Sequence, residues 1–251
     1  MKSIVNNLAV EYEDHGSGSV MLFLHGWKDT LHTFDGLSEV FSRTHRVIAL
    51  DLPGFGKSEL PKSSWGLDEY VEIVWAFSEK LGISVDVIVG HSFGGRIAIK
   101  GLSQGQLRAH KVVLIASAGI AQTHTARSLF FSLVAKIGKW STFIPPLCFW
   151  RKTLRKKLYA LTGSDYMHAG RLKETFLRVV REDLSEQARK ISIPALLLWG
   201  AEDTETPVAD GKKFAELIHN SNLKIFSDAG HFVHQEKTTE VIAAIKEFIQ
   251  S

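Results

Sequence analysis

Residues 85–102 constrain the fold more than any other stretch of this 251-residue chain. The segment Val85–Val89 is short, largely apolar and rich in β-branched side chains, which predicts a buried strand. The turn-forming sequence Gly90-His91-Ser92-Phe93-Gly94 follows, and residues 96–102 have the pattern of a helix. A strand, a tight turn and a helix are the context of a G-x-S-x-G nucleophile elbow. Ser92 is therefore a candidate nucleophile.

Segments that predict strands alternate with segments that predict helices along most of the chain. The helices include one that Asp29 or Thr30 can cap, one that Asp68 can cap and that ends near Leu81, and a last one over about 239–249. Most strand segments are apolar on both faces, as in a parallel sheet covered by helices on both sides. The sequence therefore predicts an α/β fold with a doubly wound, mostly parallel sheet. The predicted strands are residues 10–13, 20–24, 46–50, 85–89, 112–115, 195–199 and 223–226.

The alternation stops beyond Ala118. Residues 119–190 are helical in pattern and hold 14 Lys and Arg against five Asp and Glu, whereas the net charge of the whole chain is only +3. Long insertions of this kind are usually functional. We expect residues 1–118 and 191–251 to form the core domain and residues 119–190 to form a helical cap, or lid, over it.

The composition excludes several classes of protein. A hydrophobic content of 45% and a charged content of 23% are ordinary for a soluble globular domain. The first residues lack the apolar core of a signal peptide, and no apolar run reaches the ~18 residues of a membrane span. The chain has one cysteine, Cys148, as fits a reducing compartment. Together these observations favour a cytoplasmic protein. Without a CxxC or HExxH motif no metal site is expected, and we expect no cofactor. Nothing in the sequence supports nucleic-acid binding.

A serine hydroxyl becomes a good nucleophile when a base takes its proton and a third group orients that base. Asp203 and His231 are the candidates for these roles, because each comes just after a predicted strand. The carboxyl ends of the strands in a parallel sheet lie together, so all three loops are expected to meet. The rival acids are Glu202, Glu205 and Asp228, and the rival base is His234.

Five segments resemble, in order, the motifs of the α/β-hydrolase family, and the likeness covers nearly the whole chain outside the cap. They are the oxyanion loop His25-Gly26-Trp27, the loop Asp51-Leu52-Pro53-Gly54-Phe55-Gly56-Lys57-Ser58, the elbow Gly90–Gly95, the acid loop Gly200–Asp203 and the histidine loop Gly230-His231.

The resemblance implies a sheet of the eight-stranded type and a role for each motif residue. Ser92 would attack a carbonyl carbon, His231 would act as general base and then general acid, and Asp203 would orient His231. The backbone N–H groups of Trp27 and Phe93 would form the oxyanion hole. Relatives that open epoxides or displace halide carry an aspartate at the elbow, so the serine favours acyl-type chemistry.

The sequence says least about the substrate pocket. Its candidate lining residues are His25, Trp140, Phe143, Trp150 and Phe232. The alternatives are that the aromatic residues of the cap pack it against the core and that His25 makes structural hydrogen bonds. The basic cluster at residues 151–157 is a solvated helix face, a docking site for an acidic partner such as an acyl carrier protein, or a contact with an anionic lipid surface.

The complete set of triad motifs favours a serine hydrolase that cleaves a carboxylic ester, or a thioester, of a small to medium acyl substrate through an acyl-enzyme. Two alternatives stay open. The same triad can serve hydrolysis of a carbon–carbon bond in a diketone-type substrate. A hydrolase scaffold can also serve as a ligand receptor or signalling protein with slow turnover, because the fold alone does not determine function.

Overall fold

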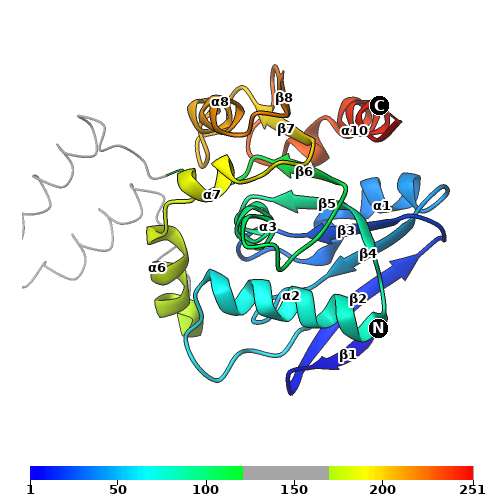
Figure 1. The fold of residues 1–251 in the computed structure, drawn as a ribbon, viewed down its shortest axis with the longest axis vertical. Helices are drawn as coiled ribbons and strands as arrows, with labels where there is room; N and C mark the ends of the chain where they lie inside the picture. Colours follow the sequence, from blue (N-terminus) through cyan, green and yellow to red (C-terminus); the bar gives the residue numbers. More distant parts are fainter. Residues whose placement is uncertain (121–169, 251) are drawn as a thin grey trace, which may run out of the picture.

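A computed structural model describes residues 1–120 and 170–250 of the chain. Its eight strands are β1 (Lys2–Val5), β2 (Leu8–His15), β3 (Val20–Leu24), β4 (Arg46–Leu50), β5 (Val85–His91), β6 (Lys111–Ile115), β7 (Ala195–Gly200) and β8 (Ser221–Phe226). They form one sheet in the order β1-β2-β4-β3-β5-β6-β7-β8 (Figure 1). The β1–β2 and β2–β4 pairs are antiparallel and the other pairs are parallel. The predicted mostly parallel α/β sheet is confirmed.

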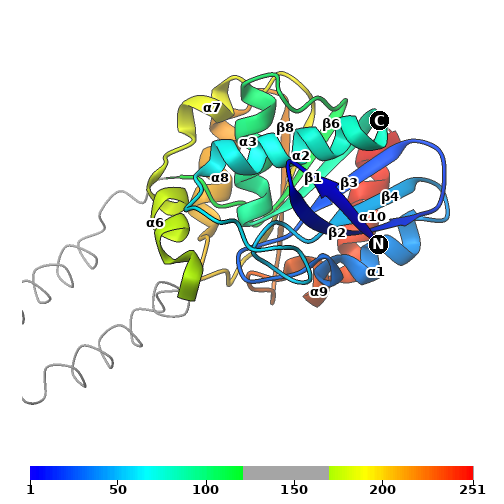
Figure 2. The same cartoon turned by 90° about the horizontal axis from the view of Figure 1, so that it is seen from below.

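Helices cover both faces of the sheet, as a doubly wound fold requires (Figure 2). Leu22 and Leu24 of β3 face one buried cluster, and Met21 and Phe23 face the other, because successive side chains of a strand point to opposite faces. The first cluster includes residues of α2 (Leu67–Leu81), α3 (Phe93–Ser103), α7 (Ser185–Arg189) and α8 (Val208–Leu217). The second includes residues of η1 (Leu31–Phe34), α1 (Asp35–Phe41), α9 (Val233–Glu236) and α10 (Thr238–Gln250).

The structure corrects the predicted elements at two places. The first strand, β1, is not in the predicted set; it forms a hairpin with β2 through Asn6 and Asn7, which both have positive φ. The helix α2 begins after Gly66 rather than at an Asp68 cap, and the Glu69 carboxylate accepts the Gly66 N–H at 2.7 Å. Asp68 instead pairs with Lys100 of α3 at 2.8 Å.

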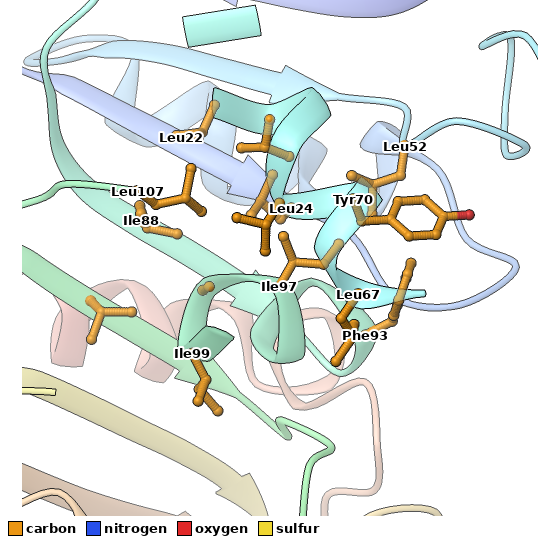
Figure 3. Close-up of a cluster of buried hydrophobic side chains, with 14 of the residues drawn as sticks. Leu22, Leu24, Leu52, Leu67, Tyr70, Ile88, Phe93, Ile97, Ile99 and Leu107 are labelled. Atoms are coloured by element: carbon orange, nitrogen blue, oxygen red, sulfur yellow. The ribbon is translucent and has the colours of Figure 1, made fainter. Parts of the chain in front are cut away.

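The position of α3 is set by a buried cluster between β3, β5, α2 and α3 (Figure 3). Ile97 and Ile99 of α3 are fully buried there, together with Leu24 of β3. Phe93, the first residue of the helix, meets the ring of Tyr70 edge-on, with 4.9 Å between ring centroids. This packing holds the amino end of α3 at the carboxyl end of β5.

The predicted cap, residues 119–190, is described only at residues 119–120 and 170–190. Its described helices are η4 (Gly170–Leu172), α6 (Lys173–Arg181) and α7. Trp140, Phe143, Trp150 and the basic cluster at 151–157 lie outside the described residues. Among the helices of residues 1–120 and 170–250, none is long and apolar enough to cross a membrane.

The close approach of α3 to β3 depends on Gly94, because a Cβ atom there would overlap the carbonyl group of Leu24. Backbone cannot move aside as a flexible side chain can, so we predict that Gly94→Ala lowers the free energy of unfolding by about 3 kcal/mol. Urea unfolding measures this loss.

Gly105→Ala is the matched control. Unlike Gly94, Gly105 has positive φ, and no atom lies within 4 Å of the position of its missing Cβ. We expect that substitution to cost about 1 kcal/mol of backbone strain. Equal losses for the two variants would contradict the packing role of Gly94.

Candidate active site

Ser92 lies in a strained turn between β5 and α3. Its backbone has φ 49° and ψ −105°, a conformation that residues other than glycine rarely adopt. Its N–H donates to Ile115 O at 3.0 Å, and its carbonyl accepts the N–H of Ala118 at 3.2 Å, so β6 and the chain beyond it hold the turn in place. Strain of this kind persists where the surrounding structure enforces it, and it is concentrated at functional sites.

Asp203 and His231 meet at the carboxyl ends of β7 and β8. His231 Nδ1 lies 2.9 Å from Asp203 Oδ2, and both residues are buried. A carboxylate can only accept, so Nδ1 carries the proton and Nε2 is left with a lone pair when the imidazole is neutral. The structure therefore brings together the predicted acid and base, in the tautomer that leaves Nε2 able to take a proton.

Thr206 is a member of this cluster that sequence reasoning missed. Asp203 Oδ1 accepts the N–H groups of Glu205 at 2.8 Å and Thr206 at 2.9 Å, and Oδ2 accepts the Thr206 hydroxyl at 2.8 Å. Burial alone would raise the pKa of Asp203, but the hydrogen bonds from His231 and Thr206 hold it below its ordinary value. The only available signal was the position of Thr206, three residues after a candidate acid.

The face of His231 opposite Asp203 meets a second carboxylate. His231 Nε2 lies 3.6 Å from Glu205 Oε2, on a side chain that is 61% exposed.

No hydrogen bond joins Ser92 Oγ to His231 in the described part of the chain, although both residues line one pocket. Hydrogen bonds between a nucleophile and its base are often long without a substrate and shorten when one binds.

The two N–H groups expected to form an oxyanion hole face no acceptor within residues 1–120 and 170–250. Phe93 is the first residue of α3, where backbone N–H groups have no partner inside the helix. The Trp27 N–H likewise makes no backbone hydrogen bond in the described structure. Trp27 and Phe93 are neighbours, with ring centroids 5.3 Å apart. Both residues line the pocket that contains Ser92, and the Phe93 N–H lies at the positive end of the α3 dipole.

A pocket of about 180 Å³ joins these groups, which is room for about six water molecules at ~30 Å³ each. Phe176, Val179 and Val180 of α6 form an apolar wall, and α6 lies beyond the carboxyl ends of the central strands (Figure 1). Phe232 lines the pocket as expected from the sequence, whereas His25 does not. The described lining residues are Gly26, Trp27, Asp29, His91, Ser92, Phe93, Arg96, Ala118, Phe176, Val179, Val180, Glu205, Thr206, His231 and Phe232.

The other histidines near Ser92 have structural partners. His25 is fully buried between backbone groups, with Nδ1 at 2.7 Å from Gly26 O and Nε2 accepting the Leu52 N–H at 2.9 Å. His234 is buried with Nε2 at 3.0 Å from Thr33 Oγ1, and burial lowers its pKa to about 3. These contacts leave His231 as the one of the three with a carboxylate partner.

Arg96 fixes the wall of the pocket from α3. Its guanidinium Nη2 donates to Val179 O at 2.5 Å and also to Glu182 O, at the end of α6. Burial lowers the pKa of Arg96 to about 10, which still leaves it charged at neutral pH. Arg96 thereby holds the carboxyl end of α6 against the helix that begins at Ser92.

Two further features of the described residues lie away from this pocket. Glu13, His32 and Asp35 place possible metal-ligand atoms within 4.8 Å of one another, but two of the three are exposed and none lines the pocket. A larger hollow of about 820 Å³ lies between the carboxyl ends of α2 and α3 and contains neither Ser92 nor its partners.

Comparisons with known proteins agree on one family. The sequence model of the "Alpha/beta hydrolase family" matches residues 21–245. An uncharacterized hydrolase, YugF of Bacillus subtilis, is 26% identical over 259 residues, covering 97% of this chain and 94% of that protein.

Solved structures are similar over the whole chain. An esterase from Exiguobacterium antarcticum has a TM-score of 0.77 at 20% identity, covering 100% of this chain and 99% of the esterase. A meta-cleavage product hydrolase from Pseudomonas fluorescens IP01 has a TM-score of 0.75 at 20% identity, covering 100% of this chain and 97% of that hydrolase.

Removal of the Thr206 hydroxyl tests whether its hydrogen bond stabilises ionised Asp203. We predict that Thr206→Val lowers the free energy of unfolding by about 1–2 kcal/mol at pH 7, because a hydrogen bond to a buried carboxylate is lost. The native pKa of Asp203 is lowered, so the stability that it contributes is present above the unfolded pKa of ~3.9 and is lost as the pH falls through the native value. The deficit of Thr206→Val should therefore shrink below about pH 4.

Urea unfolding at several pH values measures this dependence. Thr204→Val, an exposed neighbour, is the control and should change stability little at any pH. A Thr206→Val deficit that is constant from pH 3 to pH 7 would mean that the hydroxyl does not act through the carboxylate.

Proposed function

This chain belongs to the alpha/beta hydrolase family, and within that family we propose that it is a serine hydrolase of carboxylic esters. The observation that carries the proposal is the buried 2.9 Å hydrogen bond between His231 Nδ1 and Asp203 Oδ2, in the same pocket as the strained Ser92. An oriented imidazole beside a serine hydroxyl is the arrangement that activates a serine for attack on a carbonyl carbon. Thioesters are cleaved by the same steps.

The reaction proceeds in two halves. Ser92 Oγ attacks the ester carbonyl while its proton passes to His231 Nε2, and the carbonyl oxygen becomes an oxyanion. The N–H groups of Trp27 and Phe93 stabilise that oxyanion. The tetrahedral intermediate collapses, the carbon–oxygen bond to the alcohol breaks, and His231 gives the alcohol its proton. Water then attacks the acyl-enzyme with His231 again as base, which releases the acid and restores Ser92.

Asp203 and Thr206 serve His231 rather than the substrate. The Asp203 carboxylate keeps the proton on Nδ1 and stabilises the imidazolium that forms when Nε2 takes the serine proton. The two backbone N–H groups and the hydroxyl that bind Asp203 keep it ionised despite its burial. Because these hydrogen bonds fix the Asp203 oxygens, Asp203 in turn holds the His231 imidazole in one orientation.

The dimensions of the pocket support a small to medium acyl group. Its volume of about 180 Å³ is below the ~300–1,000 Å³ of pockets for drug-sized ligands. The apolar wall on α6 suits the acyl chain, since Phe176 and Val179 offer no hydrogen-bonding group. We assign α6 to the helical cap, residues 119–190, and propose that the cap selects the acyl group.

A second candidate reaction is hydrolysis of a carbon–carbon bond beside a carbonyl group. The observation in its favour is the likeness in fold to the meta-cleavage product hydrolase, at a TM-score of 0.75. The same Ser92, His231 and Asp203 would act, with a carbanion as leaving group that His231 protonates. Turnover of a diketone at a higher kcat/KM than any ester would favour this reaction. A ligand receptor on this scaffold would instead bind its ligand tightly and turn over neither the diketone nor the esters.

We predict that Ser92→Ala reduces hydrolysis of short-chain p-nitrophenyl esters by at least about 10³-fold, because the attacking oxygen is gone. The release of p-nitrophenolate by purified protein measures the rate.

Ser103→Ala provides the matched control. Ser103 ends the same helix and its hydroxyl donates to Lys100 O at 2.8 Å, away from the pocket. It should retain wild-type activity. Equal rates for wild type and Ser92→Ala would eliminate Ser92 as the nucleophile.

A further inference from the structure

Two buried acceptor atoms lie side by side in the pocket of Ser92. Asp29 Oδ2 and His91 Nδ1 are 4.0 Å apart, which is too far for a direct hydrogen bond. Each atom is buried, and neither has a hydrogen-bond partner among residues 1–120 and 170–250. Both side chains line the pocket, and the His91 side chain is only 1% exposed. A buried polar atom without a partner costs about 1–3 kcal/mol, so such a pair calls for an explanation.

The contacts of His91 decide that Nδ1 is an acceptor. His91 Nε2 lies 3.1 Å from the backbone carbonyl oxygen of His231, which can only accept, so Nε2 carries the proton. Burial first, and then the nearby His234 and His231, lower the pKa of His91 well below its ordinary value. The ring is therefore neutral at neutral pH, and Nδ1 presents a lone pair. Asp29 and His25 are the other titratable groups near the ring.

Asp29 is held so that only Oδ2 remains available. Its Oδ1 accepts the Thr30 N–H at 2.8 Å, at the start of η1. The neighbouring Gly26 leaves His91 uncovered, because a Cβ at that residue would lie 2.9 Å from Nδ1 and 3.5 Å from Ser92 Cβ. Two fixed acceptors beside the nucleophile thus point to a group that donates hydrogen bonds.

We propose that Asp29 and His91 form a subsite for a hydrogen-bond donor of the substrate, a hydroxyl or a protonated amine. The donor would lie beside Oδ2 and Nδ1: a hydroxyl or a single N–H donates to one of the two atoms, and an ammonium with two or more N–H groups can donate to both. The proposal deepens the proposed ester hydrolysis, because the donor belongs to the same small molecule as the scissile ester. The carboxylates of Asp29 and Glu205, which both line the pocket, favour a protonated amine and disfavour an acidic substituent.

The test compares esters that differ only in the donor. Hydroxyethyl butanoate is paired with methoxyethyl butanoate, and methyl hydroxybutanoate with methyl methoxybutanoate, so that the donor is on the alcohol side or on the acyl side. Dimethylaminoethyl butanoate, whose ammonium has one N–H, is paired with butanoylcholine, which has the charge but no donor. We expect the donor ester of at least one pair to have a kcat/KM about tenfold higher than its methylated partner, because the methylated ester leaves both acceptors unpaired.

Asp29→Asn then tests the subsite itself. The amide can keep its oxygen toward the Thr30 N–H, so that its NH2 group, a donor, takes the place of the acceptor Oδ2. The tenfold ratio should fall to about one. Asp35→Asn removes the same charge from an exposed side chain nearby and should keep the tenfold ratio.

Binding separates this proposal from the proposed function. Calorimetry of the same ester pairs with Ser92→Ala gives ratios of Kd that do not depend on turnover. Tighter binding of a donor ester, without any hydrolysis by wild type, would support the subsite and reject the ester hydrolase. Hydrolysis of all pairs at equal rates, with equal Kd values, would reject the subsite and leave the hydrolase standing.

Discussion

The active-site geometry depends on how closely the helix α3 approaches the strands β3 and β5. Gly94 permits contact with the backbone of Leu24, and Gly90 permits the turn to close against Gly94 and Gly95. The turn holds Ser92 at φ 49°, and Ser92 lines the pocket at the carboxyl end of β5. The position of α3 also sets the positions of Phe93 and Arg96, which line the pocket of Ser92. Arg96 in turn binds the carboxyl end of α6, which forms the apolar wall of that pocket. One short backbone contact thus organises nucleophile, oxyanion donors and pocket.

Much of the fold was predictable because the burial of each strand is visible in its residue types. The five central parallel strands are apolar on both faces, and the turns after β5, β7 and β8 carry glycine and polar residues. The parallel topology then brings Ser92, Asp203 and His231 to one edge of the sheet. The strand β1 was missed because Lys2 and Ser3 weaken its apolar pattern. The start of α2 was missed because the helix begins after Gly66, whose N–H is bound by the Glu69 carboxylate, and Asp68 is not its cap.

The polar contacts inside the site were beyond sequence reasoning. Thr206 binds Asp203 through a hydroxyl, and a lone threonine after an acid is common in any loop. Asp29 and His91 are 62 positions apart in the chain, and only the register of β3 beside β5 brings their side chains within 4.0 Å. His25 is different, because the sequence left a structural role open for it, and it is buried with hydrogen bonds to Gly26 and Leu52.

The central claim is that His231 activates Ser92 for attack. A fluorophosphonate probe that reacts with activated serines tests it directly, with the labelled peptide identified by mass spectrometry. The account predicts rapid labelling of Ser92 in the wild-type protein, and labelling slower by about 10³-fold or more in a folded His231→Ala variant. Labelling of another serine, or labelling of Ser92 at the same rate in His231→Ala, would contradict it.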